Sequence, residues 1–220
     1  DGLYALGSAC LTPVPAAVSL IGESMENTII VNDPQAEGIG VTATLCTGGE
    51  NIYMQDLTLK SVDYDRGAAN SMGRCVALQE NASKAVYKNV RLLSNQDTYY
   101  TRATKRTYWE GGMITGTVDY LCGGGDVFFN GVTLYNNARS NGDCTAPATS
   151  SDWGYVFSNC TIDGDAGQDG NYSLGRPWQG IPRAVYINPT MKIIPSAAGW
   201  SDMGAVPALF AEYNSHTESG

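Results

Sequence analysis

Five segments of the sequence repeat one pattern, in which a short apolar strand, a small or polar pivot residue and a second strand follow one another. They read NIYMQDLTLKS, KAVYKNVRLLS, RTYWEGGMITG, DVFFNGVTLYN and GYVFSNCTIDG. Aligned on one another, they have as pivots Asp56, Asn89, Gly112, Gly131 and Asn159. The residues that follow the pivots are Leu57, Val90, Met113, Val132 and Cys160. Short alternating runs of Val, Ile, Tyr, Thr and Phe, with little helical periodicity, predict a mainly β chain.

The spacing of these segments indicates a solenoid. The intervals between pivots are unequal but fall around the roughly 20 to 35 residues of one solenoid repeat, and the longer intervals would contain loops. A single coil cannot bury its apolar face alone, so it must stack on the next coil. We therefore predict an all-β parallel β-helix. A β-sandwich, whose strands also alternate and turn often, is the alternative.

Length and charge restrict the classes of protein to which the chain can belong. With 220 residues, 43% of them hydrophobic, we expect a single domain over residues 1–220. The net charge of -9 argues against nucleic acid as a partner, because phosphate binding requires basic patches. No apolar run is long enough to cross a bilayer, so we expect no membrane partner.

Cysteine and histidine exclude two common kinds of site. The six cysteines form no CxxC pair and have no companion histidine cluster, so we expect no metal. They can form disulfides in a secreted protein or remain buried thiols, and their spacing does not decide between the two. The single histidine, His216, lies in the polar segment NSHTESG, so a Ser-His-Asp hydrolase has no general base.

A polar cluster, SNQDTYYTR, places Asp97 beside an amide and a hydroxyl. Taken alone, such a cluster is more often a turn than a site. In a solenoid, however, residues one repeat apart can meet on one face. Asp119, in GTVDYLCGGGD, follows Asp97 by one coil length, and one coil further on YSLGRPWQG offers Arg176 and Trp178. An arginine can orient a carboxylate and a tryptophan can pack on a sugar ring, so we interpret the four residues as a site.

These residues carry a resemblance to a known family. The segments CVALQ, NQDTYYTR, GTVDYLCGGG and LGRPW occur in the order, and at nearly the spacing, of the four signature segments of the pectin methylesterases, carbohydrate esterase family 8. VSLIGESMENTII and GWSDMGAVPALFAEYNS resemble the family's flanking regions, so the resemblance covers almost the whole chain. It implies a right-handed, single-stranded parallel β-helix. It also implies an enzyme that removes methyl esters from the galacturonate units of pectin, releasing methanol without a metal or organic cofactor.

The resemblance also implies a role for each site residue. Asp119 would be the nucleophile, and Asp97 would protonate the leaving methanol and then take a proton from water. Gln96 would donate a hydrogen bond to the oxyanion, Arg176 would hold Asp119, and Trp178 would stack on the sugar. Two nearby carboxylates must differ in protonation, so we expect Arg176 to keep Asp119 ionised while Asp97 has a raised pKa.

Three further residues are expected to contact substrate by the same resemblance, and two positions depart from the family. The expected contacts are Arg74, Tyr100 and Tyr120. Arg74 stands where the family usually has a glutamine as second oxyanion donor, and Cys122 replaces an aromatic residue. These departures leave a catalytically weakened β-helix that binds polysaccharide as an alternative. A lyase or glycosidase is a third interpretation, distinguished by unsaturated or reducing ends in the product.

The remaining expectations concern partners and location. By resemblance, we expect methyl-esterified homogalacturonan as substrate, no cofactor and a monomer. We also expect a secreted, extracellular or periplasmic protein, and the acidic charge suits a microbial source. The segment GLYAL resembles an early part of the family's sequence, so we expect the family's N-terminal segment to be absent.

Overall fold

Parallel strands dominate the computed structural model, which describes residues 1–10 and 13–220 in full and only the backbone of Leu11 and Thr12. The helices that it describes are short: α1 spans Asp63–Arg66 and the 3₁₀ turn η1 spans Ala68–Asn70. None of the described helices is long and apolar enough to cross a membrane.

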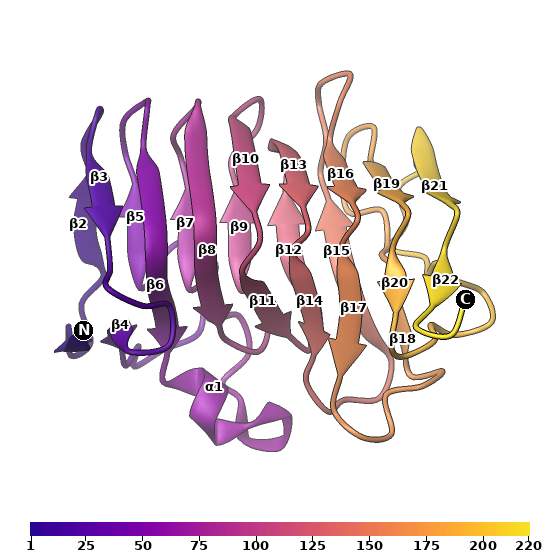
Figure 1. The fold of residues 1–220 in the computed structure, drawn as a ribbon, viewed down its shortest axis with the longest axis horizontal. Coiled ribbons are helices and arrows are strands. Elements are labelled where there is room, and N and C mark those ends of the chain that lie inside the picture. Colours follow the sequence, from indigo (N-terminus) through magenta and orange to yellow (C-terminus); the bar gives the residue numbers. More distant parts are fainter.

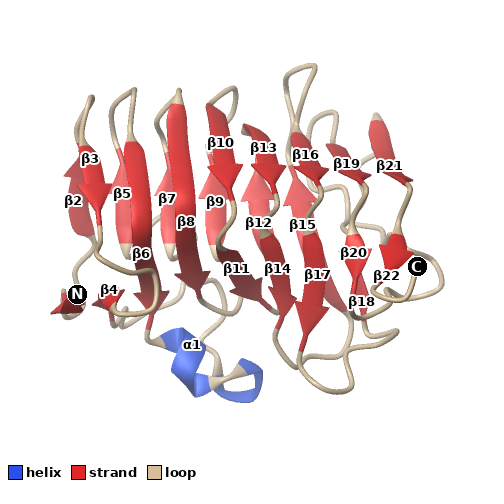
Figure 2. Ribbon diagram, viewed as in Figure 1, coloured by secondary structure: helices blue, strands red, loops and turns tan.

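The strands form two parallel sheets that run the length of the molecule (Figures 1 and 2). The seven-stranded sheet has the spatial order β18 (Tyr172–Ser173), β15 (Gly142–Pro147), β12 (Val118–Gly123), β9 (Tyr99–Thr101), β7 (Leu78–Glu80), β5 (Leu45–Thr47) and β2 (Leu11–Val14). In Figure 1 it lies behind the second sheet.

The second sheet has 15 strands and folds along the pivot residues into two halves. Two long strands, β6 (Tyr53–Ser61) and β8 (Ala85–Leu93), cross both halves. The upper half adds β3 (Ser19–Ile21), β10 (Arg106–Glu110), β13 (Asp126–Asn130), β16 (Tyr155–Ser158), β19 (Arg183–Ile187) and β21 (Leu209–Tyr213). The lower half adds β1 (Gly2–Ala5), β4 (Thr28–Asn32), β11 (Met113–Gly116), β14 (Thr133–Asn136), β17 (Thr161–Gly164), β20 (Thr190–Met191) and β22 (His216–Thr217).

Each coil contributes one strand to the rear sheet and one to each half of the front sheet. For example, β12, β13 and β14 follow one another along the chain and pair with β15, β16 and β17 of the next coil. All the described pairings are parallel, whereas the strands of a β-sandwich are antiparallel. The predicted parallel β-helix is confirmed.

The pivots bend each coil by adopting a left-handed backbone. Asp56, Asn89 and Asn159 have φ of 53°, 50° and 52°, a region in which Asn and Asp are tolerated best after glycine. Their side chains also connect neighbouring coils, since Asn89 Nδ2 donates to Asp56 Oδ1 at 2.6 Å. The pivot pattern in the sequence therefore has a conformational cause.

One pivot was predicted one residue too late. Glu110 pairs with Lys88 and Met113 with Arg91, which leaves Gly111, not Gly112, opposite Asn89. Gly112 is therefore equivalent to Val90, and the predicted equivalence of Met113 with Val90 is wrong. Two consecutive glycines look alike in a pattern, but a Cβ on Gly112 would lie 2.2 Å from the backbone oxygen of Val90, so only glycine fits there.

Aromatic rings stack along the interior from coil to coil. Phe129 and Phe157 lie 4.6 Å apart between ring centroids with planes 9° apart, and Phe157 and Tyr186 lie 4.3 Å apart at 14°. All three side chains are fully buried. Such pairs contribute about 0.5–1.5 kcal/mol each beyond burial of their apolar area. The stack therefore holds the successive coils in register.

The cysteines divide into two groups. Cys75, Cys122, Cys144 and Cys160 are buried thiols. Cys10 and Cys46 lie on adjacent coils with their Sγ atoms 3.2 Å apart. This pair is a hydrogen-bond contact between two thiols, either of which can be the donor.

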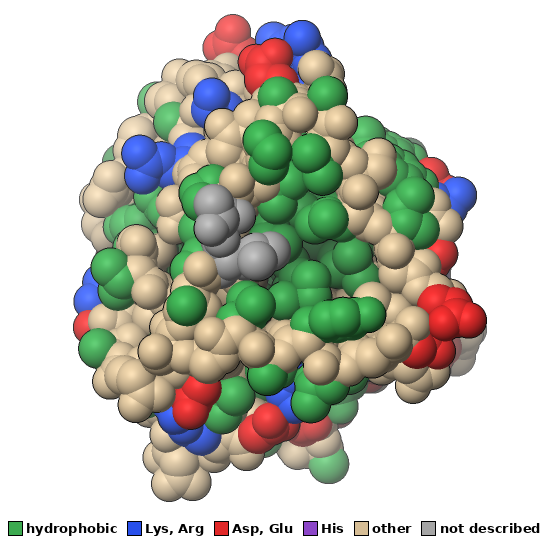
Figure 3. Space-filling view, turned by 90° about the vertical axis from the view of Figure 1, so that its left-hand side faces the viewer, with side chains coloured by type: hydrophobic (Ala, Val, Ile, Leu, Met, Phe, Trp, Pro, Cys, Tyr) green, Lys and Arg blue, Asp and Glu red, His purple; other side chains and the backbone are tan. Residues whose placement is uncertain are grey.

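The end of the solenoid that faces the viewer in Figure 3 is apolar over its centre. Large hydrophobic side chains exposed near the first coils include Leu3, Tyr4, Ile21 and Val41. A solenoid exposes the interior of its outermost coil wherever nothing covers that coil, which explains why apolar side chains gather on this face.

Candidate active site

Two carboxylates from neighbouring coils lie side by side on the rear sheet. Gln96 bridges to Val118, and Tyr99 pairs with Leu121, so Asp97 and Asp119 occupy equivalent positions on adjacent coils. Each residue is 5% exposed. The prediction that one coil length separates them is confirmed.

Both aspartates have a strained backbone. The φ angles are 58° at Asp97 and 52° at Asp119, and a left-handed non-glycine residue costs on the order of 1–3 kcal/mol. The strain reverses the ordinary alternation of side chains. After Asp119, the next two residues, Tyr120 and Leu121, both enter the core, and Cys122 faces outward again. The strained backbone is therefore what aims both carboxylates out of the solenoid.

Arg176 holds Asp119 with two hydrogen bonds. Its Nε donates to Asp119 Oδ1 at 2.8 Å and its Nη2 donates to Oδ2 at 2.6 Å. The spacing in the sequence predicted Arg176 one coil beyond Asp119, and this prediction is wrong because β15 lies between β12 and β18. The side chain reaches back across β15, to which its own backbone N–H is bonded through Thr145 O at 2.9 Å.

Asp143 is a third carboxylate that sequence analysis missed. It lies on β15, is 4% exposed, and its Oδ2 is 3.4 Å from Arg176 Nε. Its Oδ1 accepts hydrogen bonds from the hydroxyls of Ser173, at 2.5 Å, and Ser201. Arg176 is thus fixed between Asp119 and Asp143. The spacing of the coils could have indicated Asp143, because this residue comes one coil after Asp119.

A pocket of about 220 Å³ opens over these groups. Its lining residues come from seven separate parts of the chain: Ile39, Arg74, Gln96, Asp97, Asp119, Cys122, Ala146, Arg176, Trp178 and Met203. Six of the predicted site residues are therefore brought together. The sequence patterns did not single out the apolar contributors Ile39, Ala146 and Met203, although Met203 lies in the flanking segment GWSDMGAVPALFAEYNS.

Two predicted substrate contacts lie outside this lining. Tyr120 has no exposed surface and packs in the core, so the prediction that it contacts substrate is wrong. The physical reason is the left-handed Asp119, which turns the following residue inward. Tyr100 is partly exposed and pairs in register with Cys122, so it lies at the margin of the pocket.

The two central carboxyl groups differ in their surroundings. Burial, followed by the charge of Asp119, raises the pKa of Asp97 to about 7. Burial also raises the pKa of Asp119, but the hydrogen bonds and charge of Arg176 oppose that effect. Because only Asp119 is bonded by a guanidinium, Asp119 is the group that ionises first. Asp97 then keeps its proton near neutral pH.

Gln96 and Arg74 stand in one row beside the carboxylates. The two residues are bridged across adjacent coils. Gln96 makes no side-chain hydrogen bond with any residue that the structure describes, so its amide can donate into the pocket. Arg74 instead forms two bonds of 2.6 Å with the carboxylate of Glu37. Glu37, which sequence analysis missed, therefore neutralises the cation at this side of the site.

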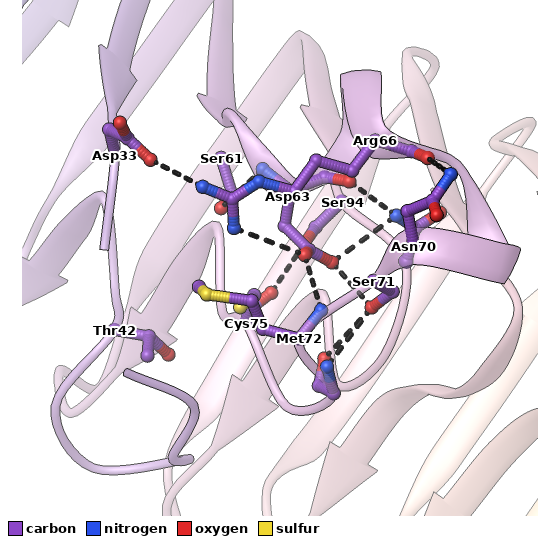
Figure 4. A network of polar contacts seen from close by, with 12 residues as sticks. Asp33, Thr42, Ser61, Asp63, Arg66, Asn70, Ser71, Met72, Cys75 and Ser94 are labelled. Carbon is purple, nitrogen blue, oxygen red and sulfur yellow. Dashed lines mark hydrogen bonds and ion pairs between the residues drawn. The ribbon is translucent and has the colours of Figure 1, made fainter. Parts of the chain in front are cut away.

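A polar network fixes the chain just before Gln96 (Figure 4). Asp63 is fully buried, and its carboxylate accepts hydrogen bonds from Ser71 Oγ at 2.6 Å and Met72 N at 2.8 Å. Asn95 Nδ2 donates to the backbone oxygen of Asp63 at 2.6 Å. The segment around α1 is thereby attached to the residue that directly precedes Gln96 and Asp97.

Comparison with known proteins identifies relatives of the chain. The family model described as Pectinesterase matches residues 11–219. Pectinesterase A of Emericella nidulans is 31% identical over 186 residues, which cover 82% of this chain and 55% of the relative. Pectinesterase 31 of Arabidopsis thaliana is 30% identical over 186 residues, covering 81% and 57%. The chain thus spans little more than half the length of these relatives.

Solved structures share the fold at lower identity. The pectin methylesterase from carrot superposes with a TM-score of 0.83 at 20% identity, covering 99% of this chain and 72% of that one. The pectin methylesterase from Yersinia enterocolitica gives 0.77 at 23% identity, with 99% and 86% covered. A pectin methylesterase in complex with a hexasaccharide gives 0.77 at 20% identity, with 99% and 81% covered.

Proposed function

Because the chain belongs to the pectinesterase family, we propose that it is a pectin methylesterase, a carboxylic ester hydrolase that removes methyl esters from the galacturonate units of pectin and releases methanol. The observation that carries the proposal is the doubly bonded Asp119–Arg176 pair beside the buried Asp97. Support for the substrate comes from the fold neighbour solved with a hexasaccharide.

In the first proposed step, a carboxylate oxygen of Asp119 attacks the ester carbonyl carbon. The carbonyl oxygen gains negative charge, and the Gln96 amide donates a hydrogen bond to it. When the intermediate collapses, the bond to the methoxy oxygen breaks and Asp97 transfers its proton to that oxygen, which leaves as methanol. Galacturonate remains bound to Asp119 as an acyl anhydride.

In the second step, water replaces methanol. Asp97, now ionised, takes a proton from the water as its oxygen attacks the acyl carbon. The bond to Asp119 breaks, its carboxylate is regenerated, and galacturonic acid is released. Arg176 orients Asp119 throughout, since its planar guanidinium matches both carboxylate oxygens. Each group thereby returns to its starting protonation state.

The pocket walls fit a sugar ester. Trp178, Ile39 and Met203 give apolar surface, against which the C–H face of a sugar ring can pack. Arg74 is neutralised by Glu37, so little free positive charge faces the ester. The proposed substrate is therefore a methyl-esterified galacturonate unit. It belongs to a cell-wall polymer, so the proposed activity requires export from the cytoplasm.

A polysaccharide-binding protein with weak catalysis is the second candidate. It is favoured by Arg74, which bonds Glu37 where the family usually has a glutamine donor, and by Cys122 in place of an aromatic residue. The two candidates differ in one respect, which is whether methanol is formed.

Methanol release from highly methylated pectin tests the proposal. The parent, Asp97→Asn, Asp119→Asn and the exposed control Asp202→Asn are compared after circular dichroism has established folding. We expect methanol from the parent and the control, at least about a hundredfold less from the other two, and no new reducing or unsaturated ends. A folded parent without methanol release would contradict the esterase and leave the binding protein. Chain cleavage would instead indicate a glycosidase or lyase.

A further inference from the structure

The front sheet carries an apolar row on its solvent-facing side. The pairings align one outward position on each of six successive strands: Tyr53, Val86, Tyr108, Phe128, Val156 and Val185. All six are at least partly exposed. The outer face of a sheet with a solvated side is ordinarily polar, so a continuous apolar row indicates a binding surface.

A groove of about 550 Å³ lies over the middle of this row. In its floor, the rings of Tyr108 and Phe128 are stacked, with centroids 6.0 Å apart and planes 15° apart. Trp153 overhangs it from the loop before β16 and is 66% exposed. Three aromatic surfaces are therefore open to solvent in one groove.

The loop that carries Trp153 is fastened to the groove floor. Asp126 Oδ1 accepts a hydrogen bond from Gly154 N at 2.9 Å and another from the Ser151 hydroxyl. Trp153 N in turn donates to Ser151 Oγ at 3.3 Å. Asp126, the carboxylate in the groove lining, is thus engaged in holding the loop that carries the tryptophan. A fixed ring binds a ligand at a lower entropic cost than a mobile one.

Uncompensated cations surround the groove although the chain carries a net charge of -9. Arg106 lines the groove, Arg183 lies beside its Gly154 wall, and Arg102 and Lys105 occupy the turn before β10. None of the four forms an ion pair with a residue that the structure describes. Two carboxylates lie at the same place, Asp126 in the lining and Asp152 beside Trp153, so the four cations leave this region with a net positive charge on an acidic protein.

We propose that this groove binds a chain of unesterified uronate units, a polyanionic polysaccharide, at a site separate from the pocket over Asp97 and Asp119. The aromatic rings match the apolar faces of sugar rings, and the arginines match their carboxylates. A second copy of this acidic chain fits the positive rim less well than a polyanion, because its net charge is spread over a globular surface.

The groove and the catalytic pocket lie on different sheets, so one polysaccharide chain can occupy both. The groove lies on the front sheet, whereas the catalytic pocket lies on the rear sheet (Figure 1). A demethylated stretch can therefore stay bound while another stretch enters the pocket. Such attachment raises the effective concentration of remaining esters. The inference rests on the proposed function in one respect, since demethylation of pectin supplies the polyuronate.

Calorimetric binding of a long unesterified oligogalacturonate tests the groove without any turnover. The Trp178→Ala background reduces binding in the catalytic pocket. In that background we expect Trp153→Ala and Arg106→Ala each to weaken binding about tenfold, and added salt to weaken it further. Matched controls elsewhere on the surface, Tyr213→Ala and Lys192→Ala, should bind like the background.

Unchanged binding in both groove variants, or equal losses in the two controls, would overturn the proposal. So would sedimentation that shows a dimer lost in Trp153→Ala, because the groove would then be an interface between copies. Methanol release from a short methylated oligomer is measured in parallel and should not change in Trp153→Ala. Groove binding without methanol release would contradict the esterase alone, and methanol release without groove binding would contradict this inference alone.

Discussion

At the scale of single residues, the site depends on two aspartates held in an unfavourable backbone conformation. The left-handed φ at Asp97 and Asp119 directs both carboxylates outward, and burial then makes ionisation of the pair costly. Arg176 offsets that cost at Asp119 through two hydrogen bonds and its charge, but at Asp97 through its charge alone. Two residues of one type thus acquire different protonation states from a single contact.

This asymmetry predicts a bell-shaped pH profile for methanol release. In the proposed mechanism Asp97 acts first as an acid, and its raised pKa keeps it protonated up to about pH 7. The rate constant kcat should therefore fall as pH rises through about 7, and it should fall at low pH as Asp119 is protonated. Initial rates under saturating pectin from pH 4 to 9 measure the profile. A kcat that stays constant up to pH 9 would contradict Asp97 as the acid.

The same shift predicts that Asp97→Asn stabilises the fold at high pH. An acid whose pKa rises from 3.8 to about 7 on folding costs nothing below pH 3.8, and the cost grows until pH 7. Its upper limit is about 4 kcal/mol. Thermal melts should show Asp97→Asn above the parent in Tm at pH 8, with little difference at pH 4. Equal differences at both values of pH would show that ionisation is not the cause.

Replacement of Arg176 by lysine should separate charge from geometry. Lysine keeps the positive charge but cannot donate two parallel hydrogen bonds to Asp119. We expect Arg176→Lys to lower kcat roughly a hundredfold with a smaller change in KM, and to move the acidic limb of the pH profile. Kinetics across pH measure both effects. Parental kcat in a folded variant would show that the paired geometry is dispensable.

At the scale of secondary-structure elements, the pivots decide how closely coils approach. Gly111 and Gly112 both have positive φ, but they differ in the room around them. A Cβ on Gly111 would meet no atom within 4 Å, whereas one on Gly112 would clash with Val90 backbone. The sequence pattern indicated a pivot here. It could not show that Gly111 is the pivot, favoured by its left-handed backbone, and that Gly112 is required because no Cβ fits there.

Two alanine substitutions test this distinction. Gly111→Ala should cost about 1 kcal/mol of unfolding free energy, because its left-handed backbone disfavours a Cβ. Gly112→Ala carries the same conformational cost and must also displace the backbone of Val90, so we expect roughly 3 kcal/mol. Urea unfolding with the parental m-value measures both. Equal losses of unfolding free energy in the two variants would contradict the close contact between Gly112 and the backbone of Val90.

At the scale of the whole molecule, one stack of aromatic rings connects coils that contribute to the pocket over Asp97 and Asp119 and to the groove. Phe157 contacts Phe129 on one side and Tyr186 on the other. Alternate residues on the same strands face outward, among them Phe128 and Val156 in the groove. The same strand register therefore aligns the core rings on the inner side of the sheet and the groove residues on its outer side.

Removal of the central ring should destabilise the solenoid as a unit. We expect Phe157→Ala to cost about 3–5 kcal/mol, through lost burial and the cavity left between two rings. For a chain of this length that corresponds to a fall in Tm of roughly 10 °C. The exposed aromatic control Tyr213→Ala should change stability by less than about 0.5 kcal/mol. A Tm for Phe157→Ala within 2 °C of the parent, an allowance of about 1 kcal/mol, would show that the rings are not coupled.

The sequence alone determined the parallel β-helix and the adjacency of Asp97 and Asp119, because a solenoid converts spacing along the chain directly into spacing across strands. It also indicated Arg176 and Trp178 through the short segment LGRPW. Only the tertiary structure decided that Arg176 reaches back over an intervening coil and that Asp143 and Glu37 complete the charge balance. Arg176 and Glu37 lie in loops, which follow no period. Asp143 does lie one coil after Asp119, but its contact with Arg176 depends on where that loop residue reaches.

The orientation of Tyr120 illustrates the same limit. Period-two alternation would place it on the same face of the strand as Cys122, but left-handed Asp119 interrupts the alternation and buries it. A single backbone angle, selected by the packing of neighbouring coils, thus decides which side chains meet a ligand. Local sequence specifies the strand, and the stacked coils specify its faces.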